Sequence, residues 1–222
     1  MIKVLVWCEH HQDQRDADVK SVYPEFMHNA IADFLRKDTE FSVKTATLED
    51  PDCGITDNVL EDTDVILWWG HIRHHDVPDE IAQKVARFVR NGGGLIPLHS
   101  AHFSKPFKLL MGTGCDLHAT GMSTERVYCT LPGHAIAKGV PEYFELKDEE
   151  VYTEFFDIPQ PDELVFIGGF SGCEVFRAGC AYYRGRGKVF YFQPGHETFP
   201  IYKTPIIQQI ICNAVKWAAP TK

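Results

Sequence analysis

Short apolar runs alternate with helical patterns through the first hundred residues, and this alternation limits the possible folds more than any other feature of the sequence. The runs expected to be strands lie at residues 3–8, 41–48, 64–69 and 95–98. Helical patterns separate them at residues 23–36, 56–61 and 78–90. Runs that are apolar without alternation are typical of strands buried on both faces. The pattern predicts an α/β fold in which a parallel sheet carries helices on both faces.

The second half of the chain is less regular than the first. Strands are expected at residues 128–131, 164–168, 174–176, 181–183 and 188–192. The string RGRG at residues 184–187 is typical of a hairpin turn, and a closing helix is expected at residues 204–218. Because the chain has 222 residues and no repeat or linker, we expect a single domain spanning residues 1–222.

Charge and cysteine content exclude several classes of protein. The chain has 31 acidic against 22 basic residues, a net charge of -9, which argues against nucleic acid or an anionic membrane as the main partner. Its seven cysteines contain no CxxC pair, as expected for free thiols in a reducing compartment. The N-terminus leads directly into a strand, and the longest apolar run is far shorter than the roughly 20 residues that span a bilayer. We therefore expect a cytoplasmic protein, and homo-oligomerisation stays open.

The chain has eleven histidines, and they are unevenly placed. Eight follow four of the predicted strands: His10, His11, His71, His74, His75, His99, His102 and His196. Glu9 precedes the first group and Glu197 follows the last. Ligands of open α/β sheets bind at the carboxyl ends of the strands. The histidine positions therefore predict a polar site at this edge of the sheet.

Two histidine pairs have the HxxH spacing, His71 with His74 and His99 with His102. On a helical turn, residues three apart share a face and can chelate one ion. Imidazole nitrogen suits zinc. We therefore expect a divalent metal ion, zinc first, held by members of this set together with His196. The alternative, in which the histidines form ordinary hydrogen bonds at strand ends, stays open.

The turn after the fourth strand is where an α/β enzyme carries a nucleophile elbow, which prefers small residues two positions before and after its apex. Around Ser100 both of these positions, Leu98 and His102, are large, whereas around His99 they include Ala101. This favours His99 as the apex. No cysteine lies in the turn, so thiolate chemistry has no candidate there.

An acidic run at residues 148–154 precedes two aromatic residues. Glu150 and Tyr152 are candidates for acid–base or hydroxyl-binding groups at the wall of the site, and Glu9 is a further candidate for contacting substrate. The alternative interpretation of the run is a solvated loop. The glycines at 92–94 precede a strand, whereas a phosphate-binding loop follows one, so no nucleotide cofactor is expected.

Six strings spread over nearly the whole chain are VWCEHH, LWWGHIRHHDV, GGGLIPLHSAHFSK, DEEVYTEFFDIP, DELVFIGGF and GRGKVFYFQPGHETFP. They resemble the trehalose-utilization ThuA-like family. The resemblance implies a three-layer α/β sandwich of flavodoxin-like type, similar to class I glutamine amidotransferases, with a mostly parallel sheet and some antiparallel strands in the C-terminal half. It also implies that His99 and Ser100 stand where amidotransferases carry their catalytic cysteine, and that His196 and Glu197 lie near their catalytic His and Glu. Amidotransferase activity is therefore not expected.

The family is associated with the use of trehalose and related disaccharides, which implies a small-molecule sugar or keto-sugar as substrate. We expect an enzyme that acts by metal-assisted or His/Glu acid–base chemistry, with catalytic candidates His99, Ser100, His196 and Glu197. Two alternatives stay open. One is a non-catalytic sugar-binding or regulatory protein on the same scaffold, and the other is a serine hydrolase that uses Ser100 and His196.

Overall fold

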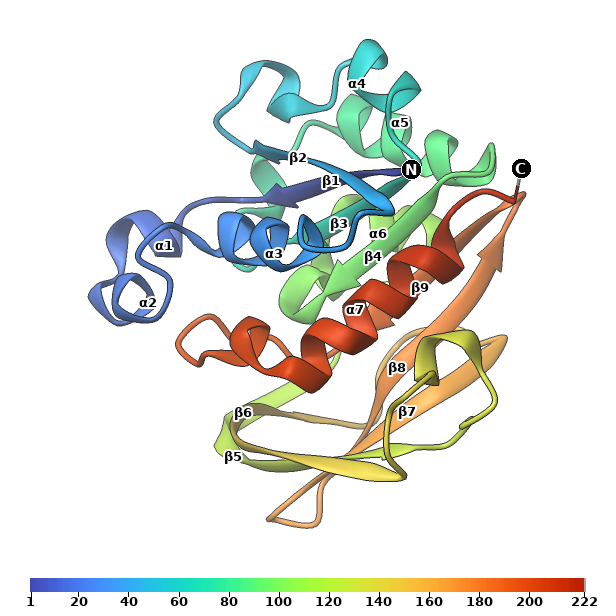
Figure 1. The fold of residues 1–222 in the computed structure, drawn as a ribbon. Helices are drawn as coiled ribbons and strands as arrows, with labels where there is room; N and C mark the ends of the chain where they lie inside the picture. Colours follow the sequence, from blue (N-terminus) through green and yellow to red (C-terminus); the bar gives the residue numbers. More distant parts are fainter. Residues whose placement is uncertain (222) are drawn as a thin grey trace.

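Nine strands of the described residues form one continuous mixed sheet in the computed structural model, in the order β2-β1-β3-β4-β9-β8-β7-β5-β6 (Figure 1). The structure describes residues 1–221, apart from the side chains of residues 12 and 13. The strands are β1 (Ile2–Cys8), β2 (Phe41–Thr47), β3 (Val65–Trp69), β4 (Gly94–Leu98), β5 (His118–Cys129), β6 (Tyr143–Thr153), β7 (Glu163–Phe170), β8 (Val175–Arg184) and β9 (Gly187–Phe192).

The sheet has a parallel half and an antiparallel half. Strands β2, β1, β3, β4 and β9 are parallel to one another, and β8, β7, β5 and β6 continue the sheet as antiparallel neighbours. The α/β fold class expected from the sequence is confirmed, and the antiparallel part is larger than expected. Strand β9 joins the halves because it pairs with β4 on one side and with β8 on the other.

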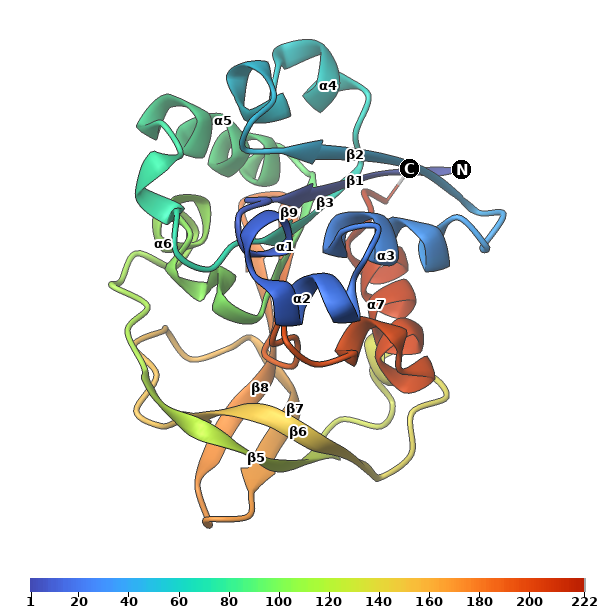
Figure 2. The same cartoon turned by 90° about the vertical axis from the view of Figure 1, so that its left-hand side faces the viewer.

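Helices cover both faces of the parallel half (Figure 2). One face carries α3 (Met27–Leu35) and α7 (Pro205–Ala218), and the other carries α4 (Asp57–Glu61), α5 (Asp79–Arg90) and α6 (Lys105–Met111). Successive side chains of a strand point to opposite faces. Along β1, Val4 and Val6 pack on the α3 and α7 side, while Leu5 and Trp7 pack on the α5 side. Because both faces are buried, the strands show no polar alternation.

Several elements differ from the sequence expectation. The helix expected at residues 23–36 begins only at Met27, because Phe26 has a φ of +67° and breaks the helical path. The polar segment after β1 contains two short helices, α1 (Gln12–Arg15) and α2 (Ala17–Val22). The two strands expected at residues 174–176 and 181–183 are one continuous strand, β8. Gly179 breaks the apolar pattern in the sequence but not the strand itself. A Cβ at Gly179 would lie 2.5 Å from the Phe166 side chain, so close packing explains this glycine.

The acidic run at residues 148–154 overlaps strand β6 and is not a solvated loop. Aspartate and glutamate are uncommon in strands, so the sequence of this run does not indicate a strand. Its antiparallel pairing with β5 holds it in place. Among the described residues, the helices are too short or too polar to cross a bilayer.

Candidate active site

The polar candidates emerge at one edge of the sheet because the strand ends are in register. The last residues of β1, β3, β4 and β9 are register partners in the order Cys8, Trp69, Leu98 and Phe192. The segments that follow them leave the sheet at the same level, at the edge that faces the viewer in Figure 2. This brings His71, His99 and His196 together, as the strand-end pattern predicts.

His99 is the apex of the turn after β4. It is fully buried and has a φ of +52°, and a short 3-10 helix, His99–Phe103, begins at this residue. His99, rather than Ser100, is also the residue that the steric argument favours as the apex. Nδ1 of His99 donates a hydrogen bond of 2.9 Å to the main-chain oxygen of Gln193 at the end of β9. Nε2 therefore faces Glu150, with 3.2 Å between Nε2 and Oε2.

Carboxylates dominate the electrostatics around His99. Burial alone would lower the pKa of His99, but its hydrogen bond to Glu150 and the charges of Glu149, Glu150 and Glu197 raise this pKa to about 9. Burial opposes ionisation of Glu150 as well, yet the contact with His99 lowers the Glu150 pKa. The arrangement favours a cation at Nε2 of His99.

Glu149, which sequence reasoning missed as a functional residue, holds the turn after β9. Its side chain is fully buried and accepts hydrogen bonds from the main-chain N–H groups of Gly195, at 2.8 Å, and His196, at 3.2 Å. The turn also needs Gly195, because a Cβ there would lie 2.2 Å from the Tyr202 hydroxyl and 3.1 Å from Cβ of His99. Glu149 thereby positions His196. Its place in the acidic run, next to Glu150, was the only sequence signal.

His196, Glu197 and His71 come from the segments that follow β9 and β3. The His196 ring lies 5.5 Å from the His99 ring and 6.3 Å from the His71 ring, measured between centroids. Nδ1 of His71 lies 3.1 Å from Oε1 of Glu197. Burial opposes ionisation of Glu197, but the His71 hydrogen bond and the charges of the three histidines lower its pKa to about 2. Glu197 is therefore a carboxylate held close to the imidazole groups.

Two side chains of the candidate site are partly exposed to solvent. The side chains of His71 and Glu150 are 26% and 19% exposed, whereas that of His99 is fully buried. The cluster therefore contacts solvent at His71 and Glu150 and not at His99.

Ser100 and Tyr152 lie beside His99. The Ser100 hydroxyl and the Tyr152 hydroxyl are 3.2 Å apart, and the Tyr152 hydroxyl is 3.4 Å from Nε2 of His99. Burial raises the pKa of Tyr152 well above its usual value, so the phenol stays a neutral hydrogen-bond donor. Ser100 is one position past the elbow apex, and its hydroxyl partner is Tyr152.

Glu9 has both carboxylate oxygens engaged by main chain. They accept hydrogen bonds from the N–H groups of His71, at 2.7 Å, Ile72, at 3.1 Å, and Arg73, at 3.0 Å. Glu9 is 1% exposed. The structure places this candidate under the loop that follows β3, where it shapes the backbone that carries His71.

Among the described residues, His74 and His102 do not join the group formed by His99, Glu150 and His196. Nδ1 of His102 donates to the main-chain oxygen of Cys115 at 2.8 Å, and burial lowers the His102 pKa to about 3. Burial lowers the His74 pKa to about 4, and its ring packs near Phe103. Of the predicted metal set, His99 and His196 come together with Glu150, and their ligand atoms lie within 4.8 Å of one another.

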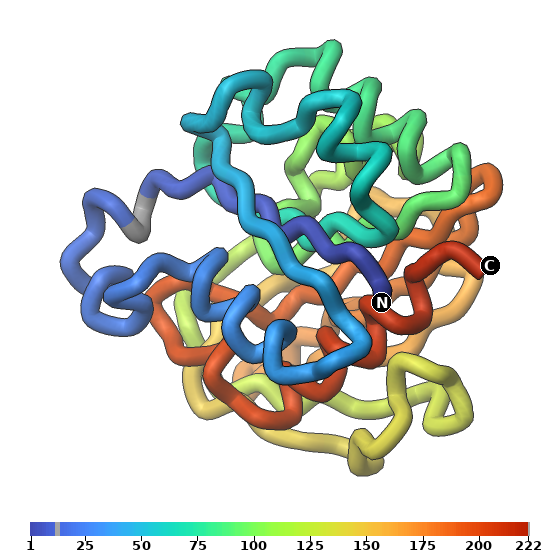
Figure 3. The backbone as a smooth tube through the Cα atoms, turned by 45° about the horizontal axis from the view of Figure 1, so that its top comes forward, coloured from blue at the N-terminus to red at the C-terminus, as the bar shows by residue number. Residues whose placement is uncertain are grey.

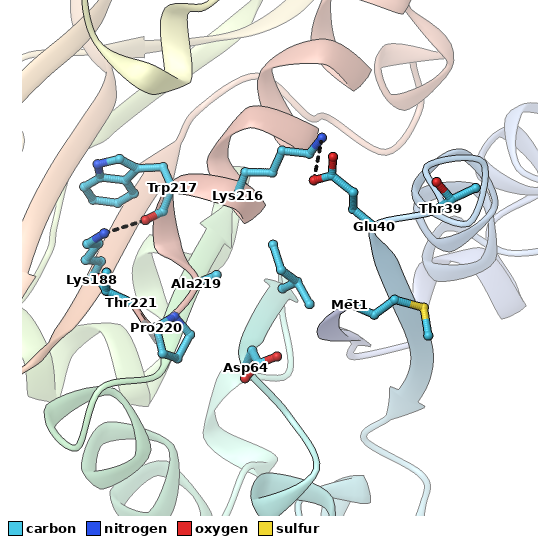
Figure 4. Close-up of a pocket in the computed structure, with 11 residues that line it drawn as sticks. Met1, Thr39, Glu40, Asp64, Lys188, Lys216, Trp217, Ala219, Pro220 and Thr221 are labelled. Carbon is cyan, nitrogen blue, oxygen red and sulfur yellow. Dashed lines mark hydrogen bonds and ion pairs between the residues drawn. The ribbon is translucent and has the colours of Figure 1, made fainter.

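A cavity of about 750 Å³ opens at the opposite end of the molecule, where the two chain termini lie side by side (Figure 3, Figure 4). Its charged groups are occupied by structural contacts. Lys216 pairs with Glu40 at 3.2 Å, and Lys188 donates to the main-chain oxygen of Trp217 at 2.7 Å. The cavity lacks the concentration of histidines and carboxylates found at the carboxyl ends of the strands, so the candidate site is placed at the latter.

Solved structures share this fold at low sequence identity. A protein described as ThuA-like from Parabacteroides merdae has a TM-score of 0.73 and 15% identity, covering 100% of this chain and 92% of that chain. A second protein described as ThuA-like, from Bacteroides uniformis, has a TM-score of 0.69 and 16% identity, covering 97% and 90%. A cytoplasmic protein from Salmonella typhimurium has a TM-score of 0.66 and 14% identity, covering 99% and 100%.

A comparison with curated proteins found no match. The family model described as ThuA, trehalose utilisation, matches residues 3–218. This range includes the candidate site and, except for Ile2 at the start of β1, every strand that the structure describes. The sequence strings, the fold and the family match agree, and the chain belongs to the ThuA (trehalose utilisation) family.

Proposed function

We propose that this chain is an enzyme that acts on a sugar or keto-sugar by acid–base chemistry. In this proposal, the His99 side of the site polarises a substrate oxygen, and Glu197 accepts a proton from a neighbouring C–H or from water. The family description, trehalose utilisation, supports a disaccharide or a keto-sugar derived from it as the substrate class. The net charge of -9 favours a small polar molecule over a nucleic acid as the partner.

The single observation that carries the proposal is the position of His99. It is fully buried at a strained strand-to-helix turn, yet Nε2 faces the Glu150 carboxylate and the Tyr152 hydroxyl. Strained backbone of this kind concentrates at functional sites. A hydrophobic side chain would fill a purely structural position at lower cost, because buried polar groups must be desolvated.

The geometry supports an electrophile and a base on opposite sides of a substrate. Abstraction of a proton beside a carbonyl requires a base near the C–H and a donor or cation near the oxygen. His99 and the Tyr152 hydroxyl can supply the donor or cation near the substrate oxygen. The Glu197 carboxylate, held by His71, can serve the proton, and His196 lies between the two sides.

The proposal is tested by incubating the purified chain with trehalose and with its keto derivative in D2O. Exchange of the proton beside the carbonyl is followed by NMR, and released monosaccharide is followed by chromatography. We expect turnover of the keto-sugar. Replacing Glu197→Gln removes the base with little change in shape, and we expect a rate loss of about 10²- to 10⁴-fold.

Glu61→Gln is the matched control, because Glu61 is exposed at the end of α4, shortly before β3 begins and therefore at the opposite end of the strands from the histidines. It should react at the rate of the unmodified chain. If the keto-sugar neither exchanges nor breaks down, or if the Glu197 variant keeps the full rate, the proposal is wrong.

A further inference from the structure

We propose a divalent metal site formed by His99, Glu150 and His196. One nitrogen or oxygen atom from each of these side chains lies within 4.8 Å of the other two. The set differs from the histidine set expected from HxxH spacing, because a carboxylate from β6 takes part in place of His71, His74 and His102. Two histidines and one carboxylate are a ligand set found at catalytic zinc sites.

The contact between His99 and Glu150 requires a cation. Nδ1 of His99 donates to the main-chain oxygen of Gln193 at 2.9 Å, which leaves the lone pair of the neutral ring on Nε2. That atom lies 3.2 Å from Oε2 of Glu150, which is also an acceptor. Either a proton or a metal ion must lie between them. With metal–ligand bonds of about 2.0–2.1 Å, two ligands on a tetrahedral zinc ion are about 3.3–3.4 Å apart, close to this separation.

The other two ligands are also oriented by neighbours. Nδ1 of His196 lies 2.9 Å from the Thr198 hydroxyl and accepts a hydrogen bond of 3.3 Å from the Thr198 main-chain N–H. Metal binding at Nε2 would require the proton of the neutral ring to move to Nδ1, where the Thr198 hydroxyl can accept it. The Tyr152 hydroxyl, which contacts Ser100 and His99, also interacts with the Glu150 side chain. Partners of this kind fix the tautomer and the orientation of metal ligands.

The surroundings suit a divalent ion with an open coordination position. The carboxylates of Glu149, Glu150 and Glu197 all act on His99 electrostatically, so the cluster is rich in negative charge. Glu150 is partly exposed, and three protein ligands leave a place for water or a substrate oxygen. Imidazole and carboxylate ligands suit zinc and related transition metals. The catalytic use of the ion, as the group that polarises the substrate oxygen, rests on the proposed function, whereas its binding does not.

The test is calorimetric titration of the chelator-stripped full chain with Zn²⁺ alone and with Mn²⁺ alone. We expect one Zn²⁺ ion per chain. His99→Gln, Glu150→Gln and His196→Gln should each weaken Zn²⁺ binding by at least about tenfold, since each removes one of three ligands. His74→Gln and His102→Gln are matched controls and should keep the affinity, because neither histidine belongs to the group of ligand atoms: His102 donates to the main-chain oxygen of Cys115, and the His74 ring lies beside Phe103.

Three results would overturn the site: no stoichiometric Zn²⁺ binding, unchanged affinity in all three ligand variants, or a loss that follows His74 and His102. Circular dichroism shows whether each variant is folded. Because a histidine variant can unfold, the unmodified chain is also titrated with Co²⁺, and absence of an absorption band from bound Co²⁺ counts against the site. Binding is measured without substrate, so a metal-free but active chain overturns only this inference, and a metal-bound but inactive chain overturns only the proposed function.

Discussion

At the scale of single residues, the site depends on where buried charge is placed. His99, Glu149 and Glu197 are all buried, and each has a partner that compensates for the loss of water. Glu125 on β5 is the contrasting case, because neither of its carboxylate oxygens has a hydrogen-bond partner among the described residues and it is fully buried. Gly168 makes room for it, since a Cβ there would lie 2.2 Å from Oε1 of Glu125.

Glu125→Gln is predicted to stabilise the protein increasingly as the pH rises. Burial, with the charge of Glu149, raises the pKa of Glu125 well above its usual value. The unfolded chain loses this proton at a lower pH than the folded protein does. Between the two pKa values, rising pH therefore favours the unfolded state and lowers the unfolding free energy of the unmodified protein. The advantage of the variant in unfolding free energy should therefore grow above pH 4.5, by at most about 1.4 kcal/mol per pH unit.

Chemical denaturation at pH 5 and pH 8 measures this difference. Glu142→Gln is the control, because Glu142 is exposed, and its effect should be the same at both pH values. An advantage for Glu125→Gln that does not change with pH would show that Glu125 is not a buried neutral acid.

At the scale of elements, β6 supplies two functional carboxylates from consecutive positions. Strand geometry sends neighbouring side chains to opposite faces. Glu149 therefore enters the interior and holds the turn after β9, while Glu150 reaches His99. One strand thus both positions the turn and contributes to the site.

Glu149→Ala is predicted to loosen the turn that carries His196. The substitution removes the acceptor of the Gly195 and His196 N–H groups. Hydrogen bonds to charged groups contribute about 1.5–3 kcal/mol each, so we expect a loss of that order in unfolding free energy. Hydrogen exchange of the two amides should accelerate. Asp148→Ala, at the exposed neighbouring position, is the control, and equal exchange in both variants would contradict the role of Glu149.

Gly187→Ala is predicted to disturb the contact between β9 and α5. A Cβ at Gly187 would lie 2.0 Å from the main-chain oxygen of Val89 and 2.4 Å from that of Gly93. Overpacking of this kind costs about 1–3 kcal/mol, and backbone atoms cannot easily move aside. Thermal unfolding should show a clear loss for Gly187→Ala. It should show almost none for Gly133→Ala, where a Cβ meets nothing within 4 Å, and equal effects would refute the argument.

At the scale of the whole molecule, β9 connects two halves of one sheet. It comes late in the sequence but lies between β4 and β8 (Figure 1). The parallel half therefore cannot be completed until nearly the whole chain is present. The site has the same property, because His99 comes from β4, Glu150 from β6 and His196 from the segment after β9.

A chain that ends at residue 185 is predicted not to fold cooperatively. It lacks β9 and α7, so β4 and β8 both lose a strand partner and one helical layer loses its longest helix. The 222-residue chain should instead unfold in a single transition, seen alike by tryptophan fluorescence and circular dichroism, because β9 pairs with both halves of the sheet. Removal of residues 220–222 alone is the control and should leave the transition cooperative. A cooperative transition in the chain ending at residue 185 would contradict this dependence on β9.

The sequence by itself determined the parallel half and the edge at which the histidines gather. Apolar runs such as Val65–Trp69 are local signals, and parallel strands share one carboxyl edge. The local rule for an elbow also identified His99 as its apex.

Only the tertiary structure decided which of these residues meet. HxxH spacing could not show that His74 and His102 stay outside the group of His99, Glu150 and His196, because that depends on tertiary contacts with Phe103 and Cys115. Nor could local pattern show that β6, at the far end of the strand order, brings Glu149 and Glu150 to His99. Antiparallel pairing between distant segments fixes that contact. The apolar pattern of a single strand does not show which other strand it pairs with.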